Sequence, residues 1–407
     1  MDTAHPGRHA RLTPPLPAGA RLLHIGLPKT GTTALQSTAQ ARREDLLAAG
    51  VRYPGGGVNH REAVSALMSR RWGWDGPGAV VPPLRHWERL MGEVRAETRR
   101  RVWISHEFAA EADDDTAARF VEELGDQIEV VVTLRPFAAV LVSSWQQYLK
   151  GGTTHTFERW LRAVLADPPE LKVTPSFHRR NDQAGVVGRW AAAAGADHVT
   201  AVVVDKGRPT QLTDAFEALL DLPPGFLVDS SLGGLQANRS MSSPESELMR
   251  QVNRAVKGQG VEWGQYEALL REGGIARLLQ SRTPDAGETL LQLPRWAADR
   301  AAELGRRYAD GIAASGVRVV GDLEVLARPV AGEDRLPART TTVPVEAATA
   351  MVVGTLSAAL GRGAFLADRA ERDRRDRRLR DVRTAELVAE VATRLRRAAG
   401  RRLRPRG

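Results

Sequence analysis

Residues 21–36 read RLLHIGLPKTGTTALQ. The apolar run Leu22 to Ile25 has the length of a buried strand. Gly26 and Gly31 then bracket a tight turn, and helical spacing of apolar residues begins at Thr32. A strand, a glycine-containing loop and a helix start in this order form an anion-binding site. The first amides of a helix have no internal partner, and the helix dipole adds partial positive charge there.

The glycine loop differs from that of nucleoside triphosphatases, which reads G-x-x-x-x-G-K-[ST] with lysine directly after the second glycine. Thr32 occupies that position here, and the lysine lies inside the loop as Lys29. Lysine is rare in this chain, with five residues against 53 arginines, so a loop lysine is not explained by composition. Thr32 and Thr33 still offer hydroxyl groups to phosphate oxygens. The loop therefore predicts an anion site that is not a standard ATP site.

Composition excludes several classes of protein. The 407 residues contain no cysteine, which excludes disulfides, thiolate catalysis and cysteine-bound zinc. No run of 18 apolar residues predicts a membrane span, and residues 1–20 lack the apolar core of a secretory signal, so we expect a cytoplasmic protein. The net charge of +9 is concentrated in residues 368–407, which hold 15 arginines and 7 acidic residues. Because the rest is nearly neutral, we predict no nucleic-acid partner.

Apolar and β-branched runs alternate with segments of helical periodicity. We expect strands at 22–25, 51–54, 101–105, 128–134, 199–204 and 317–320. We expect helices at 32–49, 82–100, 116–124, 137–150 and 211–220, and mostly helical structure at 244–314. Strand 128–134 is apolar enough to be buried on both faces. The alternation predicts an α/β fold of the P-loop type, with a parallel sheet flanked by helices.

Four parts of the chain are expected to differ in character: a disordered leader at 1–20, the α/β domain at 21–330, a linker at 331–344 and a helical, arginine-rich C-terminal extension at 345–407. Arginine alternates with acidic residues in much of this extension, which favours a solvated or oligomerising helix. A peripheral contact of the basic tail with an anionic membrane surface is the alternative.

The loop resembles a known family. Residues 25–33 look like the 5′-phosphosulfate loop of sulfotransferases that use 3′-phosphoadenylyl sulfate (PAPS), and the resemblance covers roughly residues 21–250. It implies a PAPS site whose 5′ end is bound by Gly26, Pro28, Lys29, Thr30, Gly31, Thr32 and Thr33. In that family the loop lysine contacts the oxygen between the departing phosphate and the sulfuryl group. The alternative is the generic phosphate loop of a kinase.

A second anion site is expected after strand 128–134. Arg135 leaves this strand, and Ser143 follows eight residues later in the next helix, an arrangement similar to the 3′-phosphate motif of the family. Arginine supplies a charged fork for a phosphate, and a serine hydroxyl adds a neutral donor. The alternative is that both residues have structural roles only. A further glycine-rich phosphate contact of the cytosolic family members has no clear match.

The acceptor must lose a proton during transfer, so a base is expected near the reacting atoms. Strand 101–105 ends in Ser105-His106-Glu107. Cytosolic members of the family have a catalytic histidine here, matching His106, whereas bacterial members with Ser-x-Glu match Glu107. Adjacent residues of an extended strand point to opposite faces, so we expect only one to face the cofactor, and we favour Glu107. Alternatively, both are ordinary polar residues at a strand end.

Other polar or aromatic residues give weaker signals. Asn59 and His60 resemble a substrate-side loop of related bacterial sequences, but a lone loop histidine is usually solvated. For residues 238–242 we favour helix capping by serine. For Trp103 and Trp145 we favour packing in the core. No cluster of metal ligands appears, and the expected chemistry needs no metal.

The resemblance therefore implies a PAPS-dependent sulfotransferase of the bacterial type, with adenosine 3′,5′-bisphosphate as the nucleotide product. Its acceptor is expected to be a hydroxyl or amine of a carbohydrate, glycolipid or small metabolite, and the pattern does not distinguish these. One alternative is a nucleotide-dependent small-molecule kinase, which would bind ATP with Mg²⁺. Another is a non-catalytic nucleotide-binding or scaffold protein whose arginine-rich tail binds a partner. The oligomeric state stays open.

Overall fold

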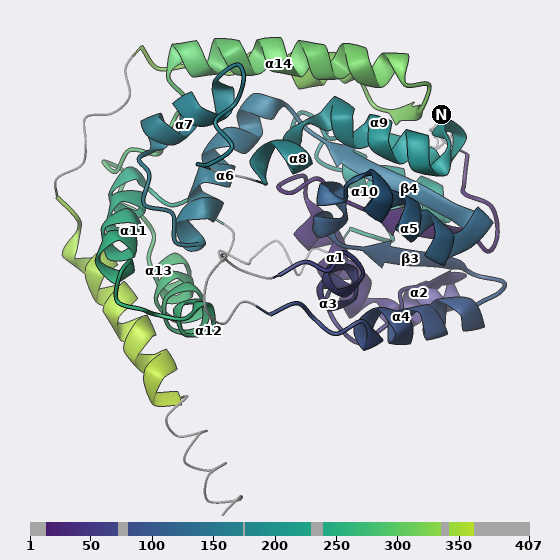
Figure 1. The fold of residues 1–407 in the computed structure, drawn as a ribbon, viewed down its shortest axis with the longest axis horizontal. Coiled ribbons are helices and arrows are strands. Elements are labelled where there is room, and N and C mark those ends of the chain that lie inside the picture. The colour runs from purple at the N-terminus through teal and green to yellow at the C-terminus, as the bar shows by residue number, and fades with distance from the viewer. Residues whose placement is uncertain (1–13, 72–79, 174–175, 229–238, 335–341, 362–407) are drawn as a thin grey trace, which may run out of the picture.

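Six parallel strands form the central sheet, in the spatial order β2-β3-β1-β4-β5-β6. The strands are β1 (Arg21–His24), β2 (Val51–Arg52), β3 (Arg101–Ser105), β4 (Ile128–Leu134), β5 (Val199–Val203) and β6 (Arg318–Val320). Helices flank the sheet (Figure 1). The predicted α/β fold with a parallel sheet is confirmed. Because β3 and β4 are the neighbours of β1 on its two sides, the loops that follow these three strands leave the sheet together.

The computed structural model describes residues 14–71, 80–173, 176–228, 239–334 and 342–361. The first thirteen residues, part of the expected linker and the arginine-rich tail lie outside these ranges. The start of the C-terminal extension is a helix, residues 345–361. Residues 14–20, expected in the leader, pack on the sheet domain: Leu16 is 2% exposed, and its amide donates to the Leu219 carbonyl at 2.9 Å. The folded part therefore begins before Arg21.

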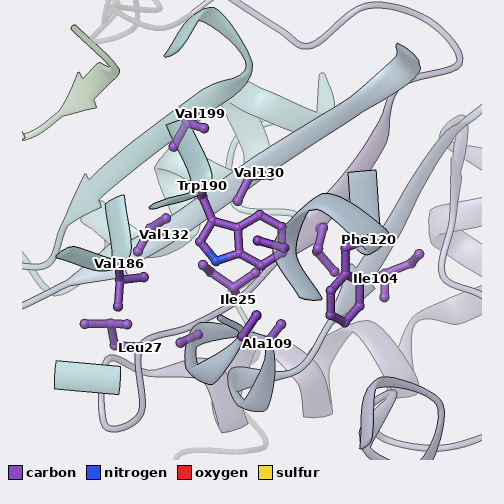
Figure 2. Close-up of a cluster of buried hydrophobic side chains, with 14 of the residues drawn as sticks. Ile25, Leu27, Ile104, Ala109, Phe120, Val130, Val132, Val186, Trp190 and Val199 are labelled. Carbon is purple, nitrogen blue, oxygen red and sulfur yellow. The ribbon is translucent and has the colours of Figure 1, made fainter. Parts of the chain in front are cut away.

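Side chains alternate between the two faces of the sheet, and each face packs against its own helices. One face is covered by α3 (Arg61–Leu67), α4 (Arg85–Ala96), α5 (Asp114–Leu124) and α9 (Gln183–Ala194). Figure 2 shows Trp190 of α9 beside Val130 of β4, and Phe120 of α5 beside Ile104 of β3. The opposite face is covered by α1 (Thr32–Ala41) and α10 (Gln211–Leu220). Both layers hold the strand ends rigidly in place.

A second hydrophobic core lies among helices beside the sheet (Figure 1). Its helices are α6 (Phe137–Lys150), α7 (Phe157–Leu165), α8 (Phe177–Asn181), α11 (Ser243–Val256), α12 (Trp263–Tyr266), α13 (Ala276–Ser281) and α14 (Arg295–Ala314). Helix α6 follows β4 almost directly, so it links the sheet to this group of helices. Among the described residues, no helix is both long and apolar enough to cross a membrane.

One predicted helix is divided in two. Residues 32–49 were expected to form a single helix, but α1 ends at Ala41 and α2 (Arg43–Ala48) follows. At the break, the Arg42 guanidinium lies 4.3 Å from the centre of the Phe226 ring and donates to the Phe226 carbonyl. This contact spans 184 residues, so a local pattern does not reveal it.

Gly305 lets α14 approach the 3₁₀ helix Leu323–Ala327 closely, and we predict that Gly305→Ala destabilises the protein. A Cβ atom at Gly305 would overlap the backbone carbonyl of Leu326, which a rotamer change cannot relieve. Overpacking of this kind costs about 1–3 kcal/mol, measurable as a lower urea midpoint at unchanged slope. The matched control is Gly188→Ala in α9, where a Cβ would meet no atom within 4 Å. Equal behaviour of the two variants would contradict the packing argument.

Candidate active site

The loop after β1 is held against β4 before it turns. The Leu27 amide donates to the Thr133 carbonyl at 2.7 Å, and the Thr133 amide donates to the Gly26 carbonyl at 2.5 Å. Gly26 and Gly31 have φ values of 81° and 95°, a region that favours glycine. Gly31 is the N-cap of α1, and because glycine has no side chain, it leaves the first amides of the helix uncapped. The start of α1 therefore presents amides to the space beyond the loop.

A chain of buried hydrogen bonds joins this loop to β1, β3 and β4. The Thr30 hydroxyl donates to the Leu27 carbonyl at 2.5 Å, since a carbonyl only accepts. Thr133 then donates to the Thr30 hydroxyl at 2.5 Å, and the Nε2 of His24 donates to the Thr133 hydroxyl at 3.4 Å. Nδ1 of His24 is left to accept from the Ser105 hydroxyl at 2.9 Å. Burial lowers the pKa of His24 to about 3, so the imidazole is neutral.

This network limits what Thr30 does. Its hydroxyl is engaged within the protein and the residue is 2% exposed, so only its backbone remains for a ligand. Gly26 likewise does not line the cavity above the loop. A Cβ atom at position 26 would lie 2.9 Å from the Cβ of Glu107. The contact explains the glycine at position 26 as a close approach of two backbone segments. Both residues thus shape the loop.

The other expected residues meet at one cavity of about 1420 Å³ at the carboxyl end of the sheet. They are Pro28, Lys29, Gly31, Thr32, Thr33, His106, Glu107, Arg135 and Ser143. The cavity extends from the loop after β1 to α6 and to the later helices. Its wall is strongly basic, with eleven lysine or arginine side chains against the three carboxylates of Glu107, Glu111 and Asp113. The site is therefore suited to an anionic ligand.

Lys29 and Arg135 are joined directly. Nη1 of Arg135 donates to the Lys29 carbonyl at 2.5 Å, which links the loop after β4 to the loop after β1. The pKa of Lys29 is lower than usual, mainly because the side chain is buried. Glu107 opposes this shift, whereas Arg135 and other nearby arginines add to it. Ser143 lies on α6 and donates to the Val140 carbonyl at 3.1 Å, the usual contact of a helical serine.

Glu107 and His106 have different surroundings. The Glu107 side chain is 27% exposed, whereas that of His106 is 3% exposed. Nδ1 of His106 accepts the Phe108 amide at 3.1 Å and caps the short helix Glu107–Glu111. Burial lowers the pKa of His106 to about 4, so its remaining proton is on Nε2, which faces Oε2 of Glu107 at 3.9 Å. His106 is thus a neutral capping residue at ordinary pH.

Glu107 is charged and incompletely bonded. Burial raises its pKa, but His106, a hydrogen bond from Gln36 and further contacts lower the pKa more, so the net value is below the usual range. Its Oε2 atom is buried and has no hydrogen-bond partner among the described residues. The side chain as a whole is partly exposed and lines the cavity, where an ionised carboxylate is able to accept a proton.

Several weaker expectations are also resolved. His60 was expected to be solvated, but it is 6% exposed: Nδ1 accepts the Ser105 amide at 3.0 Å, and Nε2 donates to the Pro54 carbonyl at 3.0 Å. That expectation was wrong, because the histidine ties its loop to β3. Ser242 caps α11 as predicted. Trp103 and Trp145 are buried core residues, also as predicted.

Four further cations of the cavity wall were not predicted from the sequence. They come from α6, from α8, from the residues before α11 and from the π-helical segment Glu267–Ile275: Lys150, Arg180, Arg239 and Arg271. Lys150 is one of only five lysines, a signal that could have singled it out as it did Lys29. The described residues contain no group of three or more side chains arranged to hold a metal ion.

Comparison with solved structures gives a distant similarity. No protein-family model and no curated protein matches the chain. A crystal structure of a sulfotransferase from Alicyclobacillus acidocaldarius is similar with a TM-score of 0.39 and 17% sequence identity, covering 61% of this chain and 95% of that chain. This chain thus has a distant structural similarity to a bacterial sulfotransferase, at a level that identifies no activity.

Proposed function

We propose that this protein is a PAPS-dependent sulfotransferase acting on a hydroxyl or amine. The observation that carries the proposal is the hydrogen bond between Arg135 and the Lys29 carbonyl. It brings the cations of two different strand ends to one cavity, which Ser143 and Glu107 also line. A nucleotide with phosphates at both its 3′ and 5′ positions needs two such anion sites side by side, with a base close to one of them.

The residues present fit this nucleotide. Lys29, with the amides and hydroxyls of Thr32 and Thr33 at the start of α1, would hold the 5′-phosphosulfate. Arg135 and Ser143 would hold the 3′-phosphate. The cavity volume of about 1420 Å³ exceeds the roughly 300–1000 Å³ of most single-ligand pockets, which leaves room for an acceptor.

Each side chain of the site has a separate role in the proposed reaction. When bound, PAPS supplies a sulfuryl group on a phosphate leaving group. The Lys29 ammonium stabilises the negative charge that develops on the leaving phosphate oxygen. The Glu107 carboxylate would accept the proton that the acceptor loses as its oxygen or nitrogen bonds to sulfur. Arg135 and Ser143 act by fixing the nucleotide so that the acceptor attacks in line.

We predict that Arg135 and Ser143 recognise the 3′-phosphate specifically. Arg135→Ala should weaken binding of adenosine 3′,5′-bisphosphate about tenfold to a hundredfold, because a charged hydrogen bond contributes about 1.5–3 kcal/mol. Ser143→Ala should weaken it by a smaller factor. Neither variant should alter binding of adenosine 5′-phosphate, measured in parallel by calorimetry.

Ser143→Ala is the more discriminating variant, since it leaves the bond between Arg135 and the Lys29 carbonyl in place. Equal losses for the two nucleotides in both variants would assign these residues a structural role and contradict the proposed 3′-phosphate site.

A further inference from the structure

Lys150 is a cation at the cavity wall that the proposed nucleotide site does not use. It is the last residue of α6, seven positions after Ser143. Seven residues are close to two helical turns, so both side chains leave the same face of α6, about 10 Å apart along its axis. Both line the cavity. The cavity therefore has a cationic group well beyond the expected 3′-phosphate position.

The cations near Lys150 differ in how far the protein neutralises them. Arg239 forms a double hydrogen bond with Glu245, at 2.7 Å for each of two pairs of atoms. On another part of the wall, Arg180 pairs with Glu111 at 3.2 Å. Lys150 has no carboxylate within 4 Å among the described residues. A cation at the wall of a cavity without a counter-ion is costly unless a ligand supplies the charge.

Arg271 approaches the same end of the cavity from a different element. It belongs to a π-helical segment, Glu267–Ile275, and lines the cavity. π-helical turns are rare and are frequent at functional sites. Helix 345–361 packs tightly behind the segment, where Cβ atoms at Gly273 and Gly274 would lie 2.9 and 3.0 Å from backbone carbonyl oxygens of that helix. The packing holds the arginine-bearing turn in place.

Lys150 shares the cavity wall with Lys29, Arg239 and Arg271. Burial lowers the pKa of Lys150 to about 8, and Lys29, Arg271 and Arg239 lower it in addition. The four cations of this wall thus repel one another, and a bound anion would relieve this repulsion.

We propose that the acceptor carries an anionic group, a carboxylate, phosphate or sulfate, that binds to Lys150 and Arg271. The inference rests on the proposed function, because it concerns the part of the cavity that the nucleotide leaves free. The proposal restricts the acceptor class: the molecule that supplies the hydroxyl or amine also carries an acidic group. A neutral acceptor would leave the Lys150 charge without a partner.

The test uses the full chain saturated with adenosine 3′,5′-bisphosphate and inorganic sulfate as the probe. Calorimetry should detect sulfate binding to this complex, weakened about tenfold or more in Lys150→Met and restored in Lys150→Arg. Binding of the bisphosphate itself should be unchanged in both variants. Lys257→Met, an exposed lysine that does not line the cavity, is the matched control.

A paired acceptor assay supplies a second readout. Methyl β-D-glucuronide and methyl β-D-glucoside differ only at C6, which is a carboxylate in the first and a hydroxymethyl group in the second. The wild-type complex should bind the glucuronide more tightly, and Lys150→Met should remove the difference. Sulfate binding that is absent, or that Lys150→Met leaves intact, would overturn the inference, as would a loss of bisphosphate affinity in that variant. Failure of the wild type to bind bisphosphate would instead refute the proposed function, and the inference with it.

Discussion

Replacing Lys29 by alanine should lower the rate of sulfuryl transfer about a hundredfold. A fixed charge next to a developing anion lowers the free energy of the transition state by about 3 kcal/mol, and each 1.36 kcal/mol changes the rate tenfold. The loss should appear in kcat more than in KM, because the charge on the leaving phosphate is larger in the transition state than in the bound nucleotide. Release of adenosine 3′,5′-bisphosphate from PAPS measures it.

The control for Lys29→Ala is Lys172→Ala, which removes an exposed lysine that does not line the cavity. It should leave kcat unchanged. A rise in KM with unchanged kcat, or a decrease in kcat shared by Lys172→Ala, would show that Lys29 does not act on the leaving group.

Glu107→Gln should lower kcat by a factor of about 10² to 10⁴, the usual contribution of a positioned base. Glutamine keeps the shape of the side chain but accepts no proton, so binding of adenosine 3′,5′-bisphosphate should persist. In the wild type, the acid limb of kcat/KM should lie below the ordinary glutamate pKa of about 4.3, since the pKa of Glu107 is lowered. Activity is therefore retained on acidification down to that range.

His106→Asn distinguishes the two candidate bases. The asparagine oxygen is able to replace Nδ1 as acceptor of the Phe108 amide, so the cap of the short helix is kept. We expect kcat to change only a few-fold, measured with the acceptor that gives the fastest turnover in a panel of hydroxylated acids. A loss as large as that of Glu107→Gln would assign the base to His106 and contradict the account.

The sheet could be predicted because its signals are local. The bounds of β3 and β4 agree with the expected strands, since a β-branched, apolar run of five to seven residues has few alternatives to a buried strand. The end of α6 at Lys150 was also expected, because glycines follow it directly. The loop at Lys29 was identified for the same reason: all its parts lie within sixteen residues.

The rest depends on contacts between distant parts of the chain. Helices α7, α8 and α9 between residues 151 and 198 were not identified individually, since their apolar faces pack in different cores. The burial of His60 depends on β3, more than forty residues away. Lys150 and Arg271 lie 121 positions apart, and only the folded cavity shows that they face the same space.

The most direct test of the central claim is calorimetric titration of the wild-type protein without Mg²⁺, in the presence of a chelator. The claim is that two cationic loops bind the two phosphates of one nucleotide. We predict tight binding of adenosine 3′,5′-bisphosphate, much weaker binding of adenosine 5′-phosphate, and little or no binding of ATP with or without Mg²⁺. Tight ATP binding that requires Mg²⁺, with no preference for the 3′-phosphate, would contradict the account and favour a kinase.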